Sequence, residues 1–120
     1  MKVIRLRDQS EERTPACGVL KNIFHSEEFG VVKFDNIGVT GRHYHRKLKE
    51  VYCLLKGTIV VEVQEKGTKF SRKVKLNEGE ALLLYPGDIH KVIKVSKVNS
   101  LLVFCIPDWR KSDEILVKDS

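Results

Sequence analysis

The amino-acid sequence predicts an all-β fold built as a closed antiparallel barrel. Short runs that alternate apolar and polar residues are separated by turn-forming residues about every ten positions, a spacing typical of β-sandwiches and β-barrels. No stretch shows the period of an amphipathic helix. The turns are expected at Lys56–Gly57, Lys66–Gly67, Asn77–Gly79, Pro86–Asp88 and Lys97–Asn99.

Three strands are predicted in the first third of the chain. They cover Met1–Arg7, where apolar and charged residues alternate, and Gly18–Phe24 and Gly30–Ile37. Gln9–Pro15 is polar throughout and is predicted to be a loop between the first two strands.

The clearest alternation lies in the middle of the chain, over residues 58–65 and 69–76. Side chains two positions apart on a strand point to the same face, so each run presents one apolar and one polar face. Arg72 interrupts the apolar face of the second run, and it lies either at the rim or in a polar interior. The apolar face is expected to hold Ile59, Val61, Val63, Phe70, Val74 and Leu76.

Two runs, Val51–Leu55 and Leu101–Ile106, are apolar on both faces. A strand with two apolar faces needs a cover on its outer face. We therefore expect a homodimer in which Cys53 or Leu55 lies near the subunit interface. One last short strand is predicted over Glu114–Val117.

Composition narrows the class of protein. The 120 residues, 42 % of them hydrophobic and 32 % charged, are expected to form one globular domain over residues 1–120. The net charge of +6 is spread along the chain, which does not favour a nucleic-acid partner. No apolar run is long enough to span a membrane, and no export signal is recognised, so a cytoplasmic location is expected. Cys17, Cys53 and Cys105 show no pairing pattern and are expected to be buried, reduced thiols.

Two segments carry residues suited to metal chemistry. His43 and His45 are two apart, so on a strand their imidazoles project to the same side, and Glu50 opens the next strand beside them. His90 follows a Pro-Gly-Asp turn that can aim it back into the barrel. Imidazoles and a carboxylate form a common ligand set for a divalent transition metal with open coordination positions.

These residues resemble the two sequence motifs of the cupin superfamily. The first motif is matched by His43, His45, Glu50 and Gly57, and the second by Gly79, Gly87 and His90. Gly38 is one residue too close to His43, Tyr85 stands at the usual proline position, and Lys94 stands at the usual asparagine position. The resemblance implies a six- to eight-stranded jelly roll, or double-stranded β-helix, with a motif core over residues 38–106. It also implies a metal inside, held by His43, His45, Glu50 and His90.

The resemblance implies manganese, iron, nickel, copper or zinc as the cofactor and a small molecule as the ligand of the barrel. We expect a metal-dependent enzyme acting on a small oxygen-bearing organic molecule. A dioxygenase-like oxidation ranks first and a sugar or keto-acid isomerase second. The alternative is a non-enzymatic module that binds a metal or metabolite.

Tyr52 and His25 lie near the predicted ligands or carry a titratable ring, and the sequence gives a different expectation for each. Tyr52 shares the face of Glu50, so it either lines the pocket as a catalytic candidate or belongs to ordinary barrel packing. His25 lies in a polar segment and is expected at the surface.

Overall fold

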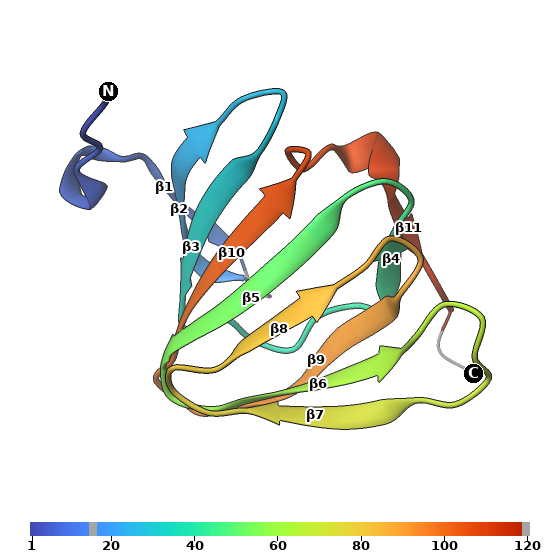
Figure 1. Ribbon diagram of the computed structural model, residues 1–120. Helices are drawn as coiled ribbons and strands as arrows, with labels where there is room; N and C mark the ends of the chain where they lie inside the picture. Colours follow the sequence, from blue (N-terminus) through green and yellow to red (C-terminus); the bar gives the residue numbers. More distant parts are fainter. Residues whose placement is uncertain (15–16, 119–120) are drawn as a thin grey trace.

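Two antiparallel sheets face each other in the computed structural model, which describes residues 1–14 and 17–118 (Figure 1). The six-stranded sheet has the order β1-β2-β3-β10-β5-β8, and the five-stranded sheet has the order β11-β4-β9-β6-β7. This confirms the predicted all-β class, although the described residues form more strands than the six to eight that the resemblance implied. The strands are β1 (Glu11–Thr14), β2 (Gly18–His25), β3 (Gly30–Asp35), β4 (His43–His45), β5 (Lys49–Lys56), β6 (Ile59–Gln64), β7 (Arg72–Leu76), β8 (Ala81–Leu84), β9 (Ile89–Val95), β10 (Ser100–Ile106) and β11 (Glu114–Leu116).

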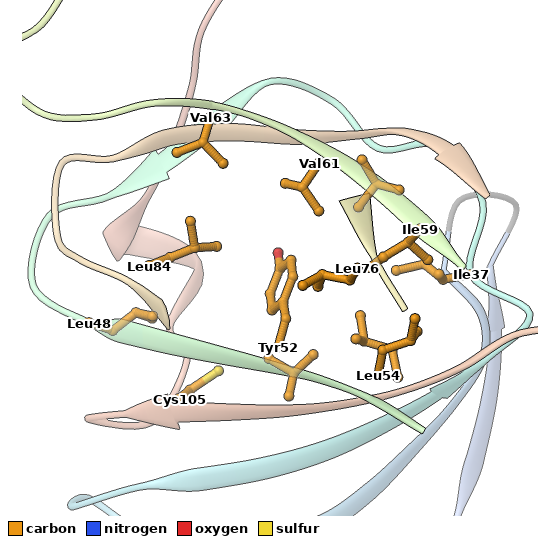
Figure 2. Packing of buried hydrophobic residues seen from close by; sticks show 13 residues of the cluster. Ile37, Leu48, Tyr52, Leu54, Ile59, Val61, Val63, Leu76, Leu84 and Cys105 are labelled. Carbon is orange, nitrogen blue, oxygen red and sulfur yellow. The ribbon is translucent and has the colours of Figure 1, made fainter. Parts of the chain in front are cut away.

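The hydrophobic core lies between the two sheets and comes from alternate residues of the central strands (Figure 2). In β6, Ile59 and Val61 are fully buried, as the alternation predicted. From the other sheet, Leu54 of β5 and Leu101 of β10 pack into the same cluster. Burial of these side chains supplies the main driving force for closing the sheets on each other, at about 25 cal/mol per Å² of apolar surface.

The predictions for the N-terminal segment were wrong in two places. Met1–Arg7 is not a strand: it has no sheet partner, and the chain instead makes an exposed 3₁₀ turn, η1 (Leu6–Asp8). The predicted loop contains β1, which pairs antiparallel with β2 in a hairpin. Backbone hydrogen bonds to β2 stabilise β1 although all four of its side chains are exposed, so its composition carried no strand signal. Pro15, the last residue of that predicted loop, lies outside the described residues.

The strand predicted over residues 69–76 is shorter than expected, and Phe70 does not belong to the core. The strand begins at Arg72, and the Phe70 side chain is 81 % exposed. Arg72 forms an exposed ion pair with Glu65, which places it at the rim. Because β7 is the edge of its sheet and pairs only with β6, the residues before Arg72 have no strand against which to pack.

The turn at Gly57 requires glycine. Its φ is +83°, a left-handed conformation that residues with a Cβ rarely adopt. A Cβ here would also collide with Ser96 Oγ and with the backbone oxygen of Val98. The glycine at the end of the first motif therefore reflects a tight packing requirement where β5 turns into β6.

The two strands with two apolar faces, β5 and β10, pair with each other in the middle of the six-stranded sheet. Their inner residues fill the core. On the outer face, one register row crosses five strands and is apolar throughout, through Leu83, Val51, Phe104, Val31 and Phe24. A second subunit of the kind that the sequence predicts would cover β8, β5, β10, β3 and β2.

Within the described residues, no helix is long and apolar enough to span a membrane. Cys17, Cys53 and Cys105 are free thiols, but the predicted burial holds only for Cys105, and Cys17 and Cys53 are half-buried. The cytoplasmic location expected from the sequence stays a prediction.

Candidate metal centre

The segment from β4 to β5 places two imidazoles and one carboxylate on the inner side of the barrel. His43 and His45 project to the same side of β4, and Glu50 lies near the start of β5 after a short connection. The Asp113 carboxylate fixes that connection, since it accepts hydrogen bonds from the backbone N–H groups of Lys47 and Leu48.

The turn before β9 brings the third imidazole to the same place. Asp88 holds this turn because its carboxylate accepts hydrogen bonds from the backbone N–H groups of Tyr85 and Lys66. His90 then lies directly opposite His43 in the antiparallel pairing of β4 with β9. The residues that two distant motifs supply therefore become neighbours on adjacent strands.

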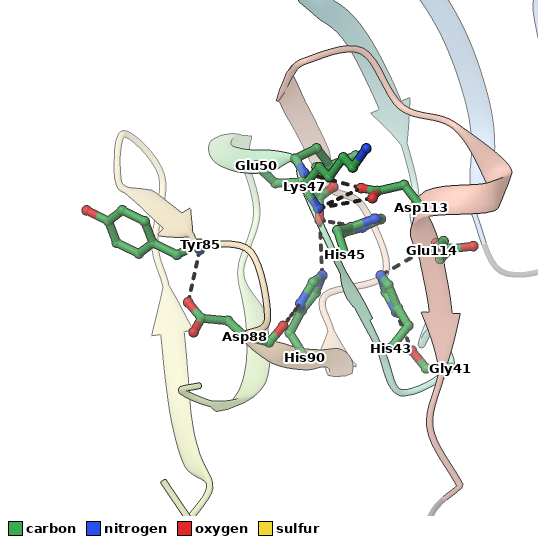
Figure 3. Close-up of polar contacts among 11 residues, drawn as sticks. Gly41, His43, His45, Lys47, Glu50, Tyr85, Asp88, His90, Asp113 and Glu114 are labelled. Atoms are coloured by element: carbon green, nitrogen blue, oxygen red, sulfur yellow. Dashed lines mark hydrogen bonds and ion pairs between the residues drawn. The ribbon is translucent and has the colours of Figure 1, made fainter. Parts of the chain in front are cut away.

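The four side chains that the sequence predicted as ligands converge on one point (Figure 3). Each offers one ligand atom, and these four atoms all lie within 4.8 Å of one another. Oε1 of Glu50 is 3.0 Å from Nε2 of His45 and 3.1 Å from Nε2 of His90. Because His45, Glu50 and His90 are buried, bulk water does not compete for these contacts.

Hydrogen bonds on the far side of two rings orient the inner nitrogens. Nδ1 of His43 donates to the carbonyl oxygen of Gly41, and Nδ1 of His90 donates to the carbonyl oxygen of Asp88, both at 2.9 Å. A neutral imidazole that donates through Nδ1 presents a lone pair at Nε2. Such carbonyl partners fix the tautomer and the ring orientation of metal-binding histidines.

The contact between His90 and Glu50 demands a cation. With Nδ1 already donating, the Nε2 lone pair of a neutral His90 would face a carboxylate oxygen 3.1 Å away. Two acceptors at that distance repel each other unless a proton or a metal ion lies between them. Three imidazoles and one carboxylate, so oriented, fit a divalent transition metal.

The titration behaviour of the cluster, without metal, reflects its burial and its charges. Burial opposes ionisation of Glu50, but hydrogen bonds from His45 and His90 outweigh it and lower the pKa to about 2. Burial also disfavours the charged form of His45, yet the hydrogen bond to Glu50 raises its pKa. The pKa of His43 is lowered by burial and by the nearby His90. The centre thus holds an ionised carboxylate that attracts a cation.

A cavity of about 620 Å³ opens beside this cluster, and His43, His45 and Glu50 lie on its wall. Apolar side chains such as Val32 and Val103 line much of the remainder. A polar cluster at the end of an apolar cavity is the usual form of a small-molecule site.

Tyr52 belongs both to the core and to the cavity wall. Its ring centroid is 6.1 Å from that of His90, and burial raises the pKa of its hydroxyl well above the ordinary value. The hydroxyl therefore stays protonated at neutral pH. A catalytic role for Tyr52 stays a prediction.

His25 is exposed, as the sequence predicted, and it also makes specific contacts. Its Nδ1 lies 3.0 Å from the Asp108 carboxylate and its Nε2 2.8 Å from the Asn22 side-chain oxygen, and it lines the same cavity. The partner Asp108 is 83 residues away in the chain, so no local pattern could have revealed the pair.

Glu114, on the last strand, was also missed as a residue of this centre. Its Oε1 is 3.7 Å from Nε2 of His43, and it lies on the cavity wall. The strand itself was predicted, but the pairing of β11 with β4 was not, and that pairing brings Glu114 to the histidines.

Comparison with known proteins places the chain in a family. The family model described as "FdtA: WxcM-like, C-terminal" matches residues 22–119, which is most of the chain and includes every residue of the cluster. The chain belongs to this WxcM-like family. No curated protein matches its sequence.

Solved structures share the fold of this WxcM-like chain at low sequence identity. A Streptomyces Pac13 variant with uridine is 13 % identical, with a TM-score of 0.77 over 98 % of this chain and 92 % of that one. KdgF from Halomonas sp. is 18 % identical, with a TM-score of 0.73 over 93 % of this chain and 98 % of that one. An oxalate decarboxylase variant from B. subtilis is 15 % identical, with a TM-score of 0.76 over 99 % of this chain but 34 % of that one. The family match and these structures confirm the resemblance to cupins that the motifs indicated.

Proposed function

We propose that this WxcM-like chain is a metal-dependent enzyme that acts on a small oxygen-bearing organic molecule. His43, His45, Glu50 and His90 would hold one divalent transition metal, which is manganese, iron, nickel, copper or zinc. The observation that carries the proposal is the contact of Glu50 Oε1 with Nε2 of His90, because the opposite side of that ring already donates its proton. A proton or a metal ion satisfies both groups, and the convergence of two more imidazole nitrogens on the same point favours a metal ion.

The reaction class that we favour is isomerisation or elimination on a sugar or keto acid. When bound, the metal would act as a Lewis acid that polarises an oxygen of the substrate. Apolar residues of the cavity wall would exclude water and so strengthen the electrostatic effect of the centre. Among proteins of this fold, Pac13 is a nucleoside dehydratase and another is an oxalate decarboxylase. Dehydration is an elimination, which supports this class by analogy, while the decarboxylase supports only a small oxygen-bearing substrate.

Dioxygenase-like oxidation, which the sequence ranked first, is now the second candidate. It would need the same metal and the same dry cavity, and neither similar protein named above is described as an oxygenase. The non-enzymatic binding module remains the alternative to both reactions. These three hypotheses differ in what they do to a bound keto compound.

The test is proton exchange at the carbon next to a carbonyl. Protein loaded with manganese or iron is incubated in D₂O with pyruvate and, separately, with dihydroxyacetone, and deuterium incorporation is followed by NMR. We expect metal-dependent exchange that disappears in His45→Ala. Oxygen consumption without exchange would support the oxidation, and neither signal across a wider panel of sugars and keto acids would support a binding module.

We also propose that the chain forms a homodimer through the outer face of the six-stranded sheet. The apolar row from Leu83 through Val51 and Phe104 to Phe24 is continuous across five strands. A second copy supplies the same apolar surface, which a two-fold axis makes self-complementary. Cys53 lies on this outer face next to Val51, as the sequence-based expectation for the interface requires.

A further inference from the structure

A second carboxylate, Glu114, faces the candidate metal centre from the C-terminal strand. In the pairing of β11 with β4, Glu114 lies directly opposite His45. Its Oε1 reaches to 3.7 Å from Nε2 of His43, on the side of that ring from which β11 approaches (Figure 3). Glu50 and Glu114 therefore reach the three imidazoles from two different sheets.

The backbone around Glu114 is held firmly along β4. The carbonyl oxygen of Asp113 accepts a hydrogen bond from the Arg46 N–H, and its carboxylate holds the connection between β4 and β5. On the other side, the N–H of Val117 donates to the carbonyl oxygen of Arg42. Because both flanks of Glu114 are bonded to the strand that carries the histidines, its carboxylate has a defined place beside them.

Glu114 differs from Glu50 in two respects that bear on its role. Its carboxylate is not among the four ligand atoms that lie within 4.8 Å of one another. Its side chain is 31 % exposed, against 8 % for Glu50, and it lines the cavity. Glu114 thus lies at the boundary between the metal cluster and the space that a small molecule would fill.

We propose that Glu114 contacts the molecule bound on the cavity side of the metal and accepts a hydrogen bond from a hydroxyl group on it. This inference rests on the proposed function, because it presumes a metal held by the four ligands. It narrows the substrate class to compounds that carry a hydroxyl next to a metal-binding oxygen, such as hydroxy acids and sugars. A carboxylate is an acceptor only, so it discriminates in favour of a hydroxyl donor.

The test compares two probes that differ by one hydroxyl group, glycolate and acetate. Their dissociation constants are measured from the visible spectrum of cobalt-loaded protein, for wild type, Glu114→Ala and Glu114→Gln. The ratio of the two affinities cancels the effect of removing a negative charge, since both probes are monoanions. The control is Glu27→Ala, which removes an exposed glutamate from the connection between β2 and β3.

We expect wild type and Glu27→Ala to bind glycolate more tightly than acetate by the same factor. In Glu114→Ala this factor should be about tenfold smaller. Glu114→Gln, which keeps a carbonyl acceptor without the charge, should lose less. An unchanged preference in both Glu114 variants would overturn this inference alone. Loss of cobalt from Glu114→Ala would overturn it in favour of a metal ligand. Wild-type protein that binds no cobalt would overturn the proposed function as well.

Discussion

Nε2 of His90 lies 3.1 Å from Oε1 of Glu50, while Nδ1 of the same ring donates to the carbonyl oxygen of Asp88. This one ring links the turn before β9 to the carboxylate on β5, across the space between the two sheets. A proton or a metal ion must lie between the two groups. The behaviour of the protein in acid, with metal and without it follows from that requirement.

Glu50 should stabilise the metal-free protein in a defined pH window. Burial raises its pKa, but hydrogen bonds from His45 and His90 lower it from 4.5 to about 2. A lowered pKa stabilises the fold above the unfolded value, and that contribution is lost as the pH falls from about 4.5 towards 2. We expect Glu50→Gln to lower the free energy of unfolding more at pH 6 than at pH 3, where part of the contribution is already lost. Urea unfolding of wild type and Glu50→Gln at both pH values measures the difference in their free energies of unfolding. An equal difference at the two pH values would contradict the lowered pKa of Glu50.

Metal binding should raise the thermal stability of the wild type. An ion that binds only the folded state at 100 times its dissociation constant adds about 2.7 kcal/mol. We expect the melting temperature to rise when manganese or zinc is added after treatment with EDTA, and to fall again with excess EDTA. His45→Ala should show no such rise. An equal rise in that variant would mean that the ion binds elsewhere.

Gly57→Ala should destabilise the fold more than Gly67→Ala. Both glycines have left-handed φ values, +83° and +82°, so both substitutions carry a backbone cost of about 1–2 kcal/mol. A Cβ at Gly67 meets nothing within 4 Å, whereas at Gly57 it collides with the β9–β10 connection. We therefore expect a further loss of about 1–3 kcal/mol for Gly57→Ala in chemical unfolding. Equal losses would contradict the packing described at this turn.

Leu83→Lys should weaken the proposed dimer. Leu83 is 45 % exposed and pairs with Val51 in the apolar row of the outer sheet face. A buried lysine at an interface is costly unless it is paired. Sedimentation at micromolar concentration should show a dimer for wild type and for Val98→Lys, an exposed loop control, and a monomer for Leu83→Lys. A monomeric wild type would remove the proposal.

Much of the fold was predictable because the signals that carry it are local. The alternation at Ile59, Val61 and Val63 marks a strand with one buried face, and the turn at Gly57 is marked by its own residue. The N-terminal hairpin was missed because β1 is held by backbone pairing with β2 rather than by its exposed side chains. Phe70 was misplaced because alternation does not reveal where an edge strand begins.

The convergence of the four predicted side chains followed from motif spacing, while their surroundings did not. Glu114 and the pair of His25 with Asp108 depend on contacts between strands far apart in the chain, and neither has a spacing that marks it. Short sequence patterns also cannot predict the identity of the substrate, because it depends on the shape of the whole cavity.

The measurement that tests the central claim most directly is the metal content of purified protein. Wild type and the His43→Ala, His45→Ala and His90→Ala variants are prepared without chelators or nickel resin and examined by elemental analysis. The control is His25→Ala, which removes a histidine of the same cavity outside the cluster. We predict about one transition-metal ion per chain in wild type and control, and less than about a tenth of that in the three variants. Equal metal content in all five proteins, or none in wild type, would contradict the account.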